Sequence, residues 1–212
     1  MLPFRSDRGE GNGVEQEDVK RVDGSVLLQI GGIVRESIVD GPGIRMTVFT
    51  QGCTHACPGC HNQQLQPFEG GTAMTVSEIL KQATDNPLLD GITLSGGEPF
   101  QQAAGCAALA RAARAAGLSV MAYSGYPLEE LLAGCNAGSG LATGQTGCNA
   151  ENGLANGKNG WGALLSQLDI LVDGPFILAQ RDLLLRFRGS ANQRLLDVPA
   201  SLKAGTAVLF DT

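Results

Sequence analysis

Three cysteines lie within eight residues of one another in the segment QGCTHACPGCHN, residues 51–62. Cys53, Cys57 and Cys60 have the spacing C-x3-C-x2-C and cannot all pair with one another as disulfides. Thiolates are soft ligands that suit an iron–sulfur cluster or zinc. Because a standard cluster holds four irons, three cysteines leave one iron open to another ligand. The segment therefore predicts a metal centre with an open position.

A second motif, SGGEP at residues 95–99, offers groups that could hold a ligand at that position. An amino acid, with its amine and carboxylate, is a molecule that an open iron can coordinate. Gly96 and Gly97 have no Cβ, so backbone can approach a bound ligand closely, and Glu98 can accept hydrogen bonds from an ammonium group. We expect this motif to bind the amino-acid end of such a ligand.

Both motifs follow segments that predict buried strands. Residues 44–50 are β-branched and aromatic, and the cysteines come directly after them. Residues 88–94 are a second short apolar segment and lead into SGGEP. Further strands are expected within residues 118–125, within 169–176 and near the end of the chain, and the sequence also allows one at 183–187.

Helical segments separate the expected strands. Thr75 and Glu78 form a capping box that opens the first helix. The expected helices cover residues 76–86, 101–116, 127–134 and 161–168. Alternating strands and helices predict an α/β fold with parallel strands covered by helices, whose ligands bind at the C-terminal strand ends. The cysteines, SGGEP, YSGY (123–126) and VDGPF (172–176) should then share one rim.

Composition limits the class of protein. The 212 residues, 43% hydrophobic and 17% charged, predict a single globular domain. A net charge of -6 gives no basic surface for nucleic acid or an anionic membrane. No apolar run reaches the roughly 20 residues of a membrane span. We expect a cytoplasmic protein whose cysteines bind metal rather than form a disulfide framework.

Two segments are expected to lie outside the packed domain. Residues 1–24 are charged and glycine-rich and predict a flexible N-terminal extension. Residues from about 134 to 160 are rich in glycine and asparagine and predict a flexible insertion. The domain is therefore expected over residues 25–212, interrupted by this insertion.

The cysteine spacing followed by SGGEP resembles the radical S-adenosylmethionine superfamily. SIVDGPGIRMTVFTQGCTHACPGCHN, residues 37–62, is similar to the activases of glycyl radical enzymes. CPGCHN, VDGPF and FRGSANQR most resemble the activases of anaerobic ribonucleoside-triphosphate reductase. The resemblance covers roughly residues 38–196 without the insertion. It implies a radical SAM fold, a partial, open β/α barrel of parallel strands with outer helices.

The resemblance also implies a reaction. Cys53, Cys57 and Cys60 would hold a [4Fe-4S] cluster, and S-adenosylmethionine would chelate the fourth iron. Reductive cleavage would give a 5'-deoxyadenosyl radical, which would take a hydrogen from a backbone glycine of the anaerobic ribonucleoside-triphosphate reductase. Reduced flavodoxin or ferredoxin would donate the electron. The chain would then be an activating enzyme of the oxidoreductase class.

Individual positions are carried over from the resemblance. Gly59, Cys60, His61, Gly97 and Glu98 match contacts to S-adenosylmethionine. Many superfamily members have an aromatic residue where this chain has Gly59, so His61 is the candidate for the flat surface against the adenine.

Further positions match the region near the partner. Asp40, Gly41 and Arg45 resemble the activase segment close to the partner's glycine loop. Asp173 and residues 188–194 are additional candidates for substrate or partner contact.

Two alternatives remain. The cysteines could form a structural zinc site, with His55 or His61 as the fourth ligand, in a non-catalytic interaction module. Within the enzyme class, the partner could be another glycyl radical enzyme, such as one of the formate-lyase type.

Overall fold

A computed structural model describes residues 25–137 and 160–211 of the chain. The predicted N-terminal extension, residues 1–24, lies outside the described residues, and so does most of the predicted insertion. Residues 134–137, its first part, belong to a helix.

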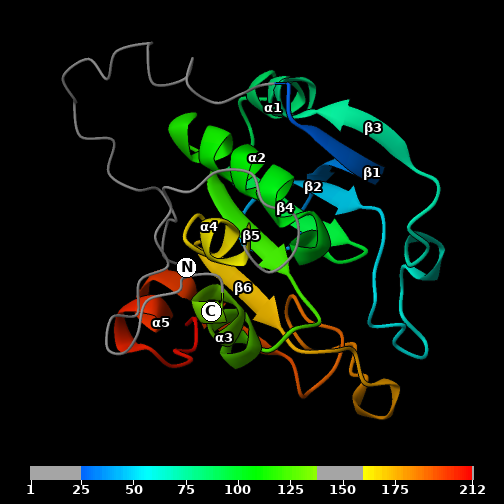
Figure 1. The fold of residues 1–212 in the computed structure, drawn as a ribbon, viewed down its shortest axis with the longest axis vertical. Helices are drawn as coiled ribbons and strands as arrows, with labels where there is room; N and C mark the ends of the chain where they lie inside the picture. The colour runs from blue at the N-terminus through cyan, green and yellow to red at the C-terminus, as the bar shows by residue number, and fades with distance from the viewer. Residues whose placement is uncertain (1–24, 138–159, 212) are drawn as a thin grey trace.

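A seven-stranded sheet forms the centre of the described part, in the order β3-β1-β2-β4-β5-β6-β7 (Figure 1). The strands are β1 (Leu27–Ser37), β2 (Arg45–Thr50), β3 (Thr72–Thr75), β4 (Gly91–Gly96), β5 (Ser119–Tyr123), β6 (Ile170–Asp173) and β7 (Arg194–Asp197). The expected strands at 44–50, 88–94, 118–125 and 169–176 are confirmed, with shifted ends at 88–94, where the strand begins only at Gly91.

The sheet is mixed and not closed, so the expectation of parallel strands holds only for its centre. Strands β2, β4, β5 and β6 are parallel neighbours, whereas β1, β3 and β7 pair antiparallel. The connection at residues 38–44, which joins β1 to β2, explains why these two strands pair antiparallel. Parallel neighbours need a crossover of a dozen or more residues, and this connection is too short for one.

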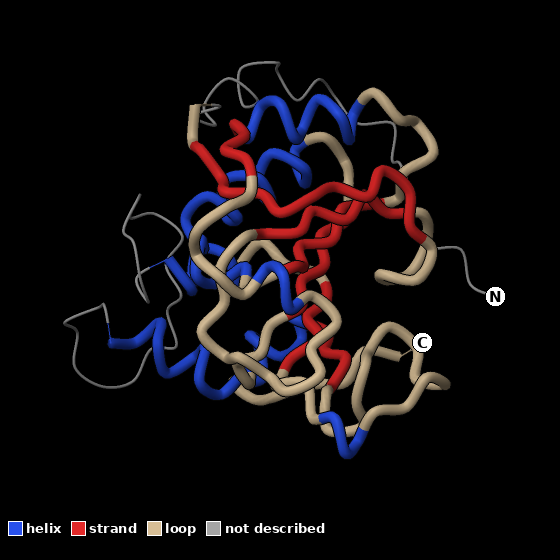
Figure 2. Tube along the Cα trace, turned by 90° about the vertical axis from the view of Figure 1, so that its right-hand side faces the viewer, coloured by secondary structure: helices blue, strands red, loops and turns tan. Residues whose placement is uncertain are grey.

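The helices gather mainly on one side of the sheet (Figure 2). They are α1 (Val76–Thr84), α2 (Ala103–Ala115), α3 (Leu128–Ala137), α4 (Trp161–Leu165) and α5 (Val198–Ala204), with short 3-10 helices η2 (Gln63–Leu65), η3 (Pro99–Gln102) and η5 (Leu178–Gln180). The predicted capping box of Thr75 and Glu78 is present at α1. Helix α2 begins later than expected because η3 occupies residues 99–102.

Apolar side chains pack on both faces of the sheet. The larger cluster lies between the sheet and the helices and includes Leu94, Leu109 and Trp161. A smaller one contains Met121, Ile170, Val172 and Leu195, against which Phe187 and Phe210 pack. Residues 183–187 form turns rather than the strand that the sequence allowed. Phe187 has φ 59°, a left-handed conformation that interrupts an extended strand.

Among the described residues, no helix combines the length and the apolar character needed to cross a bilayer.

Candidate functional site

A cavity of about 450 Å³ lies where the parallel strands β2, β4, β5 and β6 end. The loops after all four strands contribute to its lining, as the sequence predicted. The predicted site residues in that lining are Asp40, Cys53, Cys57, Cys60, His61, Gly97 and Glu98. A volume of this size accommodates a small organic ligand.

The cysteine loop, residues 51–62, is fixed through its backbone. Gly52 N donates to Leu65 O at 2.8 Å, and Cys53 N donates to Gln66 O at 2.9 Å. Farther along, Cys60 N donates to Cys57 O at 3.1 Å and closes a turn around Pro58-Gly59. The beginning of the loop is therefore anchored to residues 65 and 66, and its later part closes on itself in a turn.

Gly59 occupies a turn position in this structure. Its φ of 75° after a proline is typical of the third residue of a type II turn. A Cβ at Gly59 would lie 3.0 Å from Leu178 Cδ1, and Gly59 is not among the residues that line the cavity. Its conformational freedom therefore serves to bring Cys57 and Cys60 close together.

All three thiols of the loop are free and partly buried. His55 N donates to Cys53 Sγ at 3.4 Å, and Asn62 N donates to Cys60 Sγ at 3.4 Å. Such N–H donors stabilise negative charge on sulfur and tune an iron–sulfur cluster. Burial raises the pKa of the Cys53 thiol, and the hydrogen bond from His55 N partly offsets this. A metal bound there would displace a proton.

The zinc alternative requires His55 or His61 to join the cysteines around one ion. Within residues 25–137 and 160–211, no three His, Cys, Asp or Glu side chains converge as they would around one metal ion. In a cluster each cysteine binds its own iron, so the sulfurs need not surround one point. His55, a candidate zinc ligand, instead has its Nε2 3.1 Å from Glu98 Oε2. In this structure His55 is therefore engaged with Glu98.

The carboxylate of Glu98 joins three loops. Its side chain is 1% exposed. Oε2 contacts His55 Nε2 at 3.1 Å and accepts from Gly125 N at 2.8 Å. Oε1 accepts from Phe100 N at 3.1 Å and from Ser124 Oγ at 3.0 Å. Glu98 with these four partners, called the Glu98 network below, fastens the cysteine loop to the loop after β5.

Tyr126 supports the same part of the cysteine loop. Its ring meets the His55 ring edge-on, with the centroids 4.3 Å apart. Gln101 Nε2 donates to the Tyr126 hydroxyl at 2.7 Å and to Thr54 Oγ1 at 3.1 Å. The sequence predicted that YSGY lies on this rim, but no pattern in it indicated that Tyr126 packs on the cysteine loop.

The glycine pair of SGGEP lets two backbones lie against each other. A Cβ on Gly97 would lie 2.3 Å from Gly52 O, and one on Gly96 would lie 2.5 Å from Thr50 N. Glu98 N donates to Gly52 O at 2.8 Å. Gly97 thus lies against the cysteine loop and Gly96 against the end of β2, and both glycines also line the cavity.

Arg45, a predicted partner contact, is 0% exposed. Its guanidinium donates to Thr93 Oγ1 at 2.8 Å, to Ser119 Oγ at 2.8 Å and to Ile92 O at 2.6 Å. Burial lowers the pKa of Arg45 to about 10, although the carboxylates of Asp169 and Asp90 oppose this shift. In this conformation Arg45 is buried and ties β2, β4 and β5 together.

Gly41 and Asp40 lie beside Arg45 in the loop between β1 and β2. Gly41 is buried, and a Cβ there would lie 2.8 Å from Arg45 Cδ. Asp40 lines the cavity and accepts from Ser37 Oγ at 2.6 Å and Thr47 Oγ1 at 3.0 Å. Of the three predicted partner contacts, Asp40 is the one that reaches the cavity.

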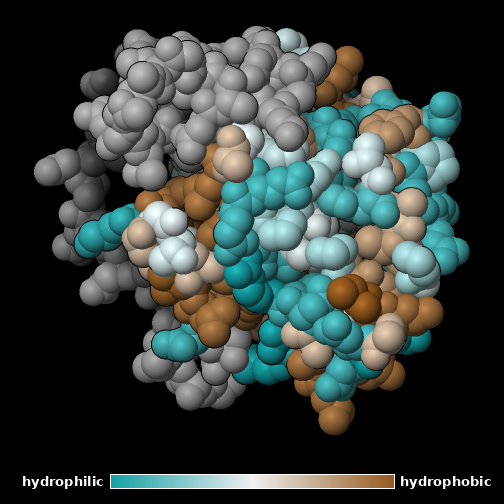
Figure 3. Space-filling view, turned by 60° about the horizontal axis from the view of Figure 1, so that its bottom comes forward, coloured by the Kyte–Doolittle hydropathy of each residue, from teal (hydrophilic) through white to brown (hydrophobic). Residues whose placement is uncertain are grey.

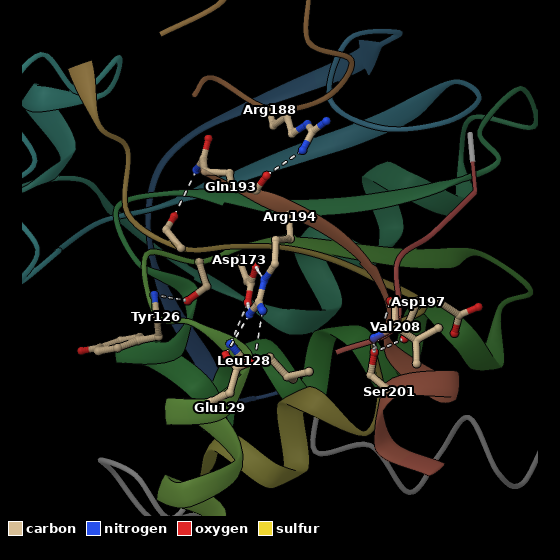
Figure 4. A network of polar contacts seen from close by, with 12 residues as sticks. Tyr126, Leu128, Glu129, Asp173, Arg188, Gln193, Arg194, Asp197, Ser201 and Val208 are labelled. Carbon is tan, nitrogen blue, oxygen red and sulfur yellow. Dashed lines mark hydrogen bonds and ion pairs between the residues drawn. The ribbon is translucent and has the colours of Figure 1, made fainter. Parts of the chain in front are cut away.

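The β6–β7 loop, residues 174–193, forms another wall of the cavity through Phe176, Leu185, Phe187, Arg188, Gly189 and Gln193. Arg188 Nη1 donates to Gln193 O at 2.7 Å (Figure 4). Gln193 Oε1 accepts from Gly189 N at 2.9 Å. The ring of Phe176 lies 5.5 Å from that of His61. VDGPF was predicted to lie on this rim, but no pattern in the sequence indicated that Phe176 would present an aromatic ring beside His61.

Asp173 and Arg194, also candidates for substrate or partner contact, have structural partners (Figure 4). Asp173 is 1% exposed, accepts from Leu128 N at 2.7 Å, and accepts from Arg194 Nε at 3.0 Å. Arg194 also donates to Glu129 at 2.8 Å. These contacts fasten helix α3 to β6 and β7.

Comparisons with known proteins agree on one family. The model of a 4Fe-4S single cluster domain matches residues 39–196. The anaerobic ribonucleoside-triphosphate reductase-activating protein of Haemophilus influenzae is 31% identical over 166 residues, which cover 74% of this chain and 89% of that protein. The protein of the same name from Escherichia coli K12 is 32% identical over 164 residues, covering 74% of this chain and 90% of that protein.

Two other proteins match smaller parts. The pyruvate formate-lyase-activating enzyme of Clostridium pasteurianum is 42% identical over 82 residues, which cover 36% of this chain and 34% of that enzyme. The crystal structure of QueE from Escherichia coli matches 52% of this chain and 57% of that chain with a TM-score of 0.35 and 13% identity. That structural likeness is too weak to support a statement about function.

Proposed function

Because this chain belongs to the family of anaerobic ribonucleoside-triphosphate reductase-activating proteins and has its 4Fe-4S single cluster domain, we propose that it generates a glycyl radical on such a reductase. The observation that carries the proposal is the cavity shared by the three cysteines and the SGGEP loop. The four parallel strands that end there support the finer description of the fold as an open β/α barrel of the radical SAM type.

The cysteines Cys53, Cys57 and Cys60 would hold the [4Fe-4S] cluster, and the rest of the cavity would receive S-adenosylmethionine. Bound together and reduced, these groups supply a 5'-deoxyadenosyl radical. Gly97 and Glu98 would contact the amino-acid end of S-adenosylmethionine, and Cys60 would offer backbone groups. The neighbouring rings of His61 and Phe176 offer a flat surface for the adenine.

The chain's own residues position these groups and limit the access of water. The Glu98 network and Tyr126 hold the cysteine loop in place before anything binds. Phe49, Phe176 and Phe187 line the cavity with apolar rings. Excluding water protects a reactive radical from side reactions.

Several further features belong to the same proposal. Reduced flavodoxin or ferredoxin would supply the electron, and the protein would work in the cytoplasm. Residues 25–212 would form one domain, with the extension and the insertion outside its core. Asp40 is the residue of the DGPGIR segment placed to meet the partner's glycine loop.

A second candidate partner is a glycyl radical enzyme of the formate-lyase type. The similarity to the pyruvate formate-lyase-activating enzyme of Clostridium pasteurianum favours it, although this match covers only 36% of the chain. The longer matches to the reductase-activating proteins favour the reductase.

Electron paramagnetic resonance tests the proposal. The anaerobically reconstituted protein is reduced and incubated with S-adenosylmethionine and either the anaerobic reductase or pyruvate formate-lyase. We expect a glycyl radical signal on the reductase. A glycyl radical signal on pyruvate formate-lyase alone would refute the reductase as partner and support the second candidate. A colourless protein that holds one zinc ion and leaves S-adenosylmethionine intact would refute both.

A further inference from the structure

The β6–β7 loop has two different sides. Its inner side lines the cavity, whereas Leu183 and Leu184 project into solvent with 79% and 90% of their surface exposed. Figure 1 draws this loop in orange at the lower right. Figure 3 brings the bottom of that view forward and shows hydrophobic side chains among hydrophilic ones at its lower right edge. Leu185, the next residue, lines the cavity, so the leucines stand directly at its edge.

A second loop presents apolar side chains at the same cavity. Ile38 and Val39, between β1 and β2, are 74% and 70% exposed, and Val39 also contributes to the cavity lining. Apolar side chains from two separate loops therefore lie at the margin of one cavity. Clustered exposed apolar side chains of this kind mark interaction sites, whereas single ones need no explanation.

The leucines are held outward by the structure of their loop. Leu184 N donates to Asp182 Oδ1 at 2.8 Å, and Ala191 N donates to Gln180 O at 2.8 Å across the base of the loop. On the inner side, Phe187 packs on the smaller core cluster. Hydrogen bonds within the loop therefore hold Leu183 and Leu184 in their exposed positions.

We propose that Leu183 and Leu184, with Ile38 and Val39, form a docking surface for the segment of the partner that carries the reacting glycine. This proposal rests on the proposed function. A glycine has no side chain by which an enzyme could select it, so recognition must come from the residues that flank it. Those residues must lie against the cavity margin when the glycine reaches the cavity.

The charge of the loop indicates the chemistry of the partner segment. Residues 174–193 contain Arg181, Arg186 and Arg188 against Asp182, which gives +3 - 1 = +2 in a chain whose net charge is -6. A basic loop in an acidic protein attracts acidic groups. The segment that fits has apolar side chains beside the glycine and acidic residues next to them.

A double variant, Leu183→Ser with Leu184→Ser, tests the docking surface. Neither residue is part of the cavity lining. The matched control is Leu88→Ser, because Leu88 is 62% exposed but lies between α1 and β4, before that strand begins. Two activities are measured for each protein: cleavage of S-adenosylmethionine without partner, and glycyl radical formation as the reductase concentration is varied.

We expect the double variant to cleave S-adenosylmethionine at the wild-type rate while its KM for the reductase rises about tenfold, as for loss of an apolar anchor. The control should match wild type in both assays. An unchanged KM in the double variant, or an equal rise in the control, overturns the docking surface. Absence of a glycyl radical with the wild-type protein refutes the proposed function instead, so the two failures are distinguishable.

Discussion

Replacing Glu98 with glutamine removes a charge but leaves the side-chain size unchanged, and it should destabilise the protein. The two carboxylate oxygens face the backbone N–H groups of Phe100 and Gly125, one on each side. An amide has only one acceptor oxygen, and its nitrogen is a donor. Either orientation of the glutamine therefore sets two donors against each other and leaves one backbone N–H unpaired.

The magnitude follows from the burial of this site. Glu98 is 1% exposed, so water cannot replace the lost partner. A hydrogen bond to a charged group contributes about 1.5–3 kcal/mol, and an orphaned buried donor costs about 1–3 kcal/mol. These two figures partly describe the same loss and are therefore not added in full. We expect Glu98→Gln to lower the free energy of unfolding by about 3 kcal/mol.

Anaerobic denaturant unfolding, followed by circular dichroism, measures this change. Glu130→Gln is the matched control, because Glu130 is exposed on helix α3. The rate at which a chelator removes iron from the reconstituted protein is a second readout, since a loosened cysteine loop should release iron faster. A Glu98→Gln protein within about 0.5 kcal/mol of wild type, the usual range for surface substitutions, would refute the role assigned to the Glu98 network.

Three further predictions concern the cluster, the buried arginine and the pH dependence of stability. Cys57→Ala should abolish cluster binding and cleavage of S-adenosylmethionine, as measured by iron content and product analysis; retained activity would contradict the ligand assignment. Arg45→Met should cost about 3 kcal/mol in denaturant unfolding, because it leaves buried acceptors on β4 and β5 without donors; unchanged stability would show that these bonds matter little. Hydrogen bonding from Arg194 lowers the pKa of Glu129 in the folded protein. The pair therefore stabilises the fold fully at a pH above 4.5, the ordinary pKa of glutamate, and this stabilisation is lost as the pH falls through the lower pKa of the folded state. Glu129→Gln should remove this pH-dependent loss of stability, which amounts to about 0.5 kcal/mol because Glu129 is largely exposed. If the free energy of unfolding of the variant depended on pH as that of the wild type does, the pair would not contribute in this way.

The sequence predicted the central strands and the shared rim because local patterns determine them. Residues 44–50 are suited to a buried strand, and the cysteines must follow that strand wherever it lies. Strand direction is not visible in such patterns, so the antiparallel edges were missed. The shortness of the connection at residues 38–44 was a usable signal, since it excludes a parallel crossover.

The role of Glu98 could not be predicted from its own motif. Its partners Ser124, Gly125 and His55 lie 26, 27 and 43 residues away in the sequence. A motif indicates which side chains are chemically able to bind, but the fold decides which groups they meet.

The burial of Arg45 could not be predicted from its motif either. Arginine is usually exposed, and its position in DGPGIR suggested a surface role. In the structure, acceptors on β4 and β5 surround its guanidinium and make burial possible. Because these acceptors come from strands far along the chain, only the folded sheet brings them to Arg45.

Isotope transfer tests the central claim most directly. The reductase is prepared with deuterium on the α-carbon of its glycines and activated by the reduced protein in the presence of S-adenosylmethionine. We predict that the 5'-deoxyadenosine formed carries deuterium and that its amount matches the glycyl radical on the reductase. Unlabelled 5'-deoxyadenosine alongside that glycyl radical would contradict direct hydrogen transfer from the partner's glycine to the radical formed in this cavity.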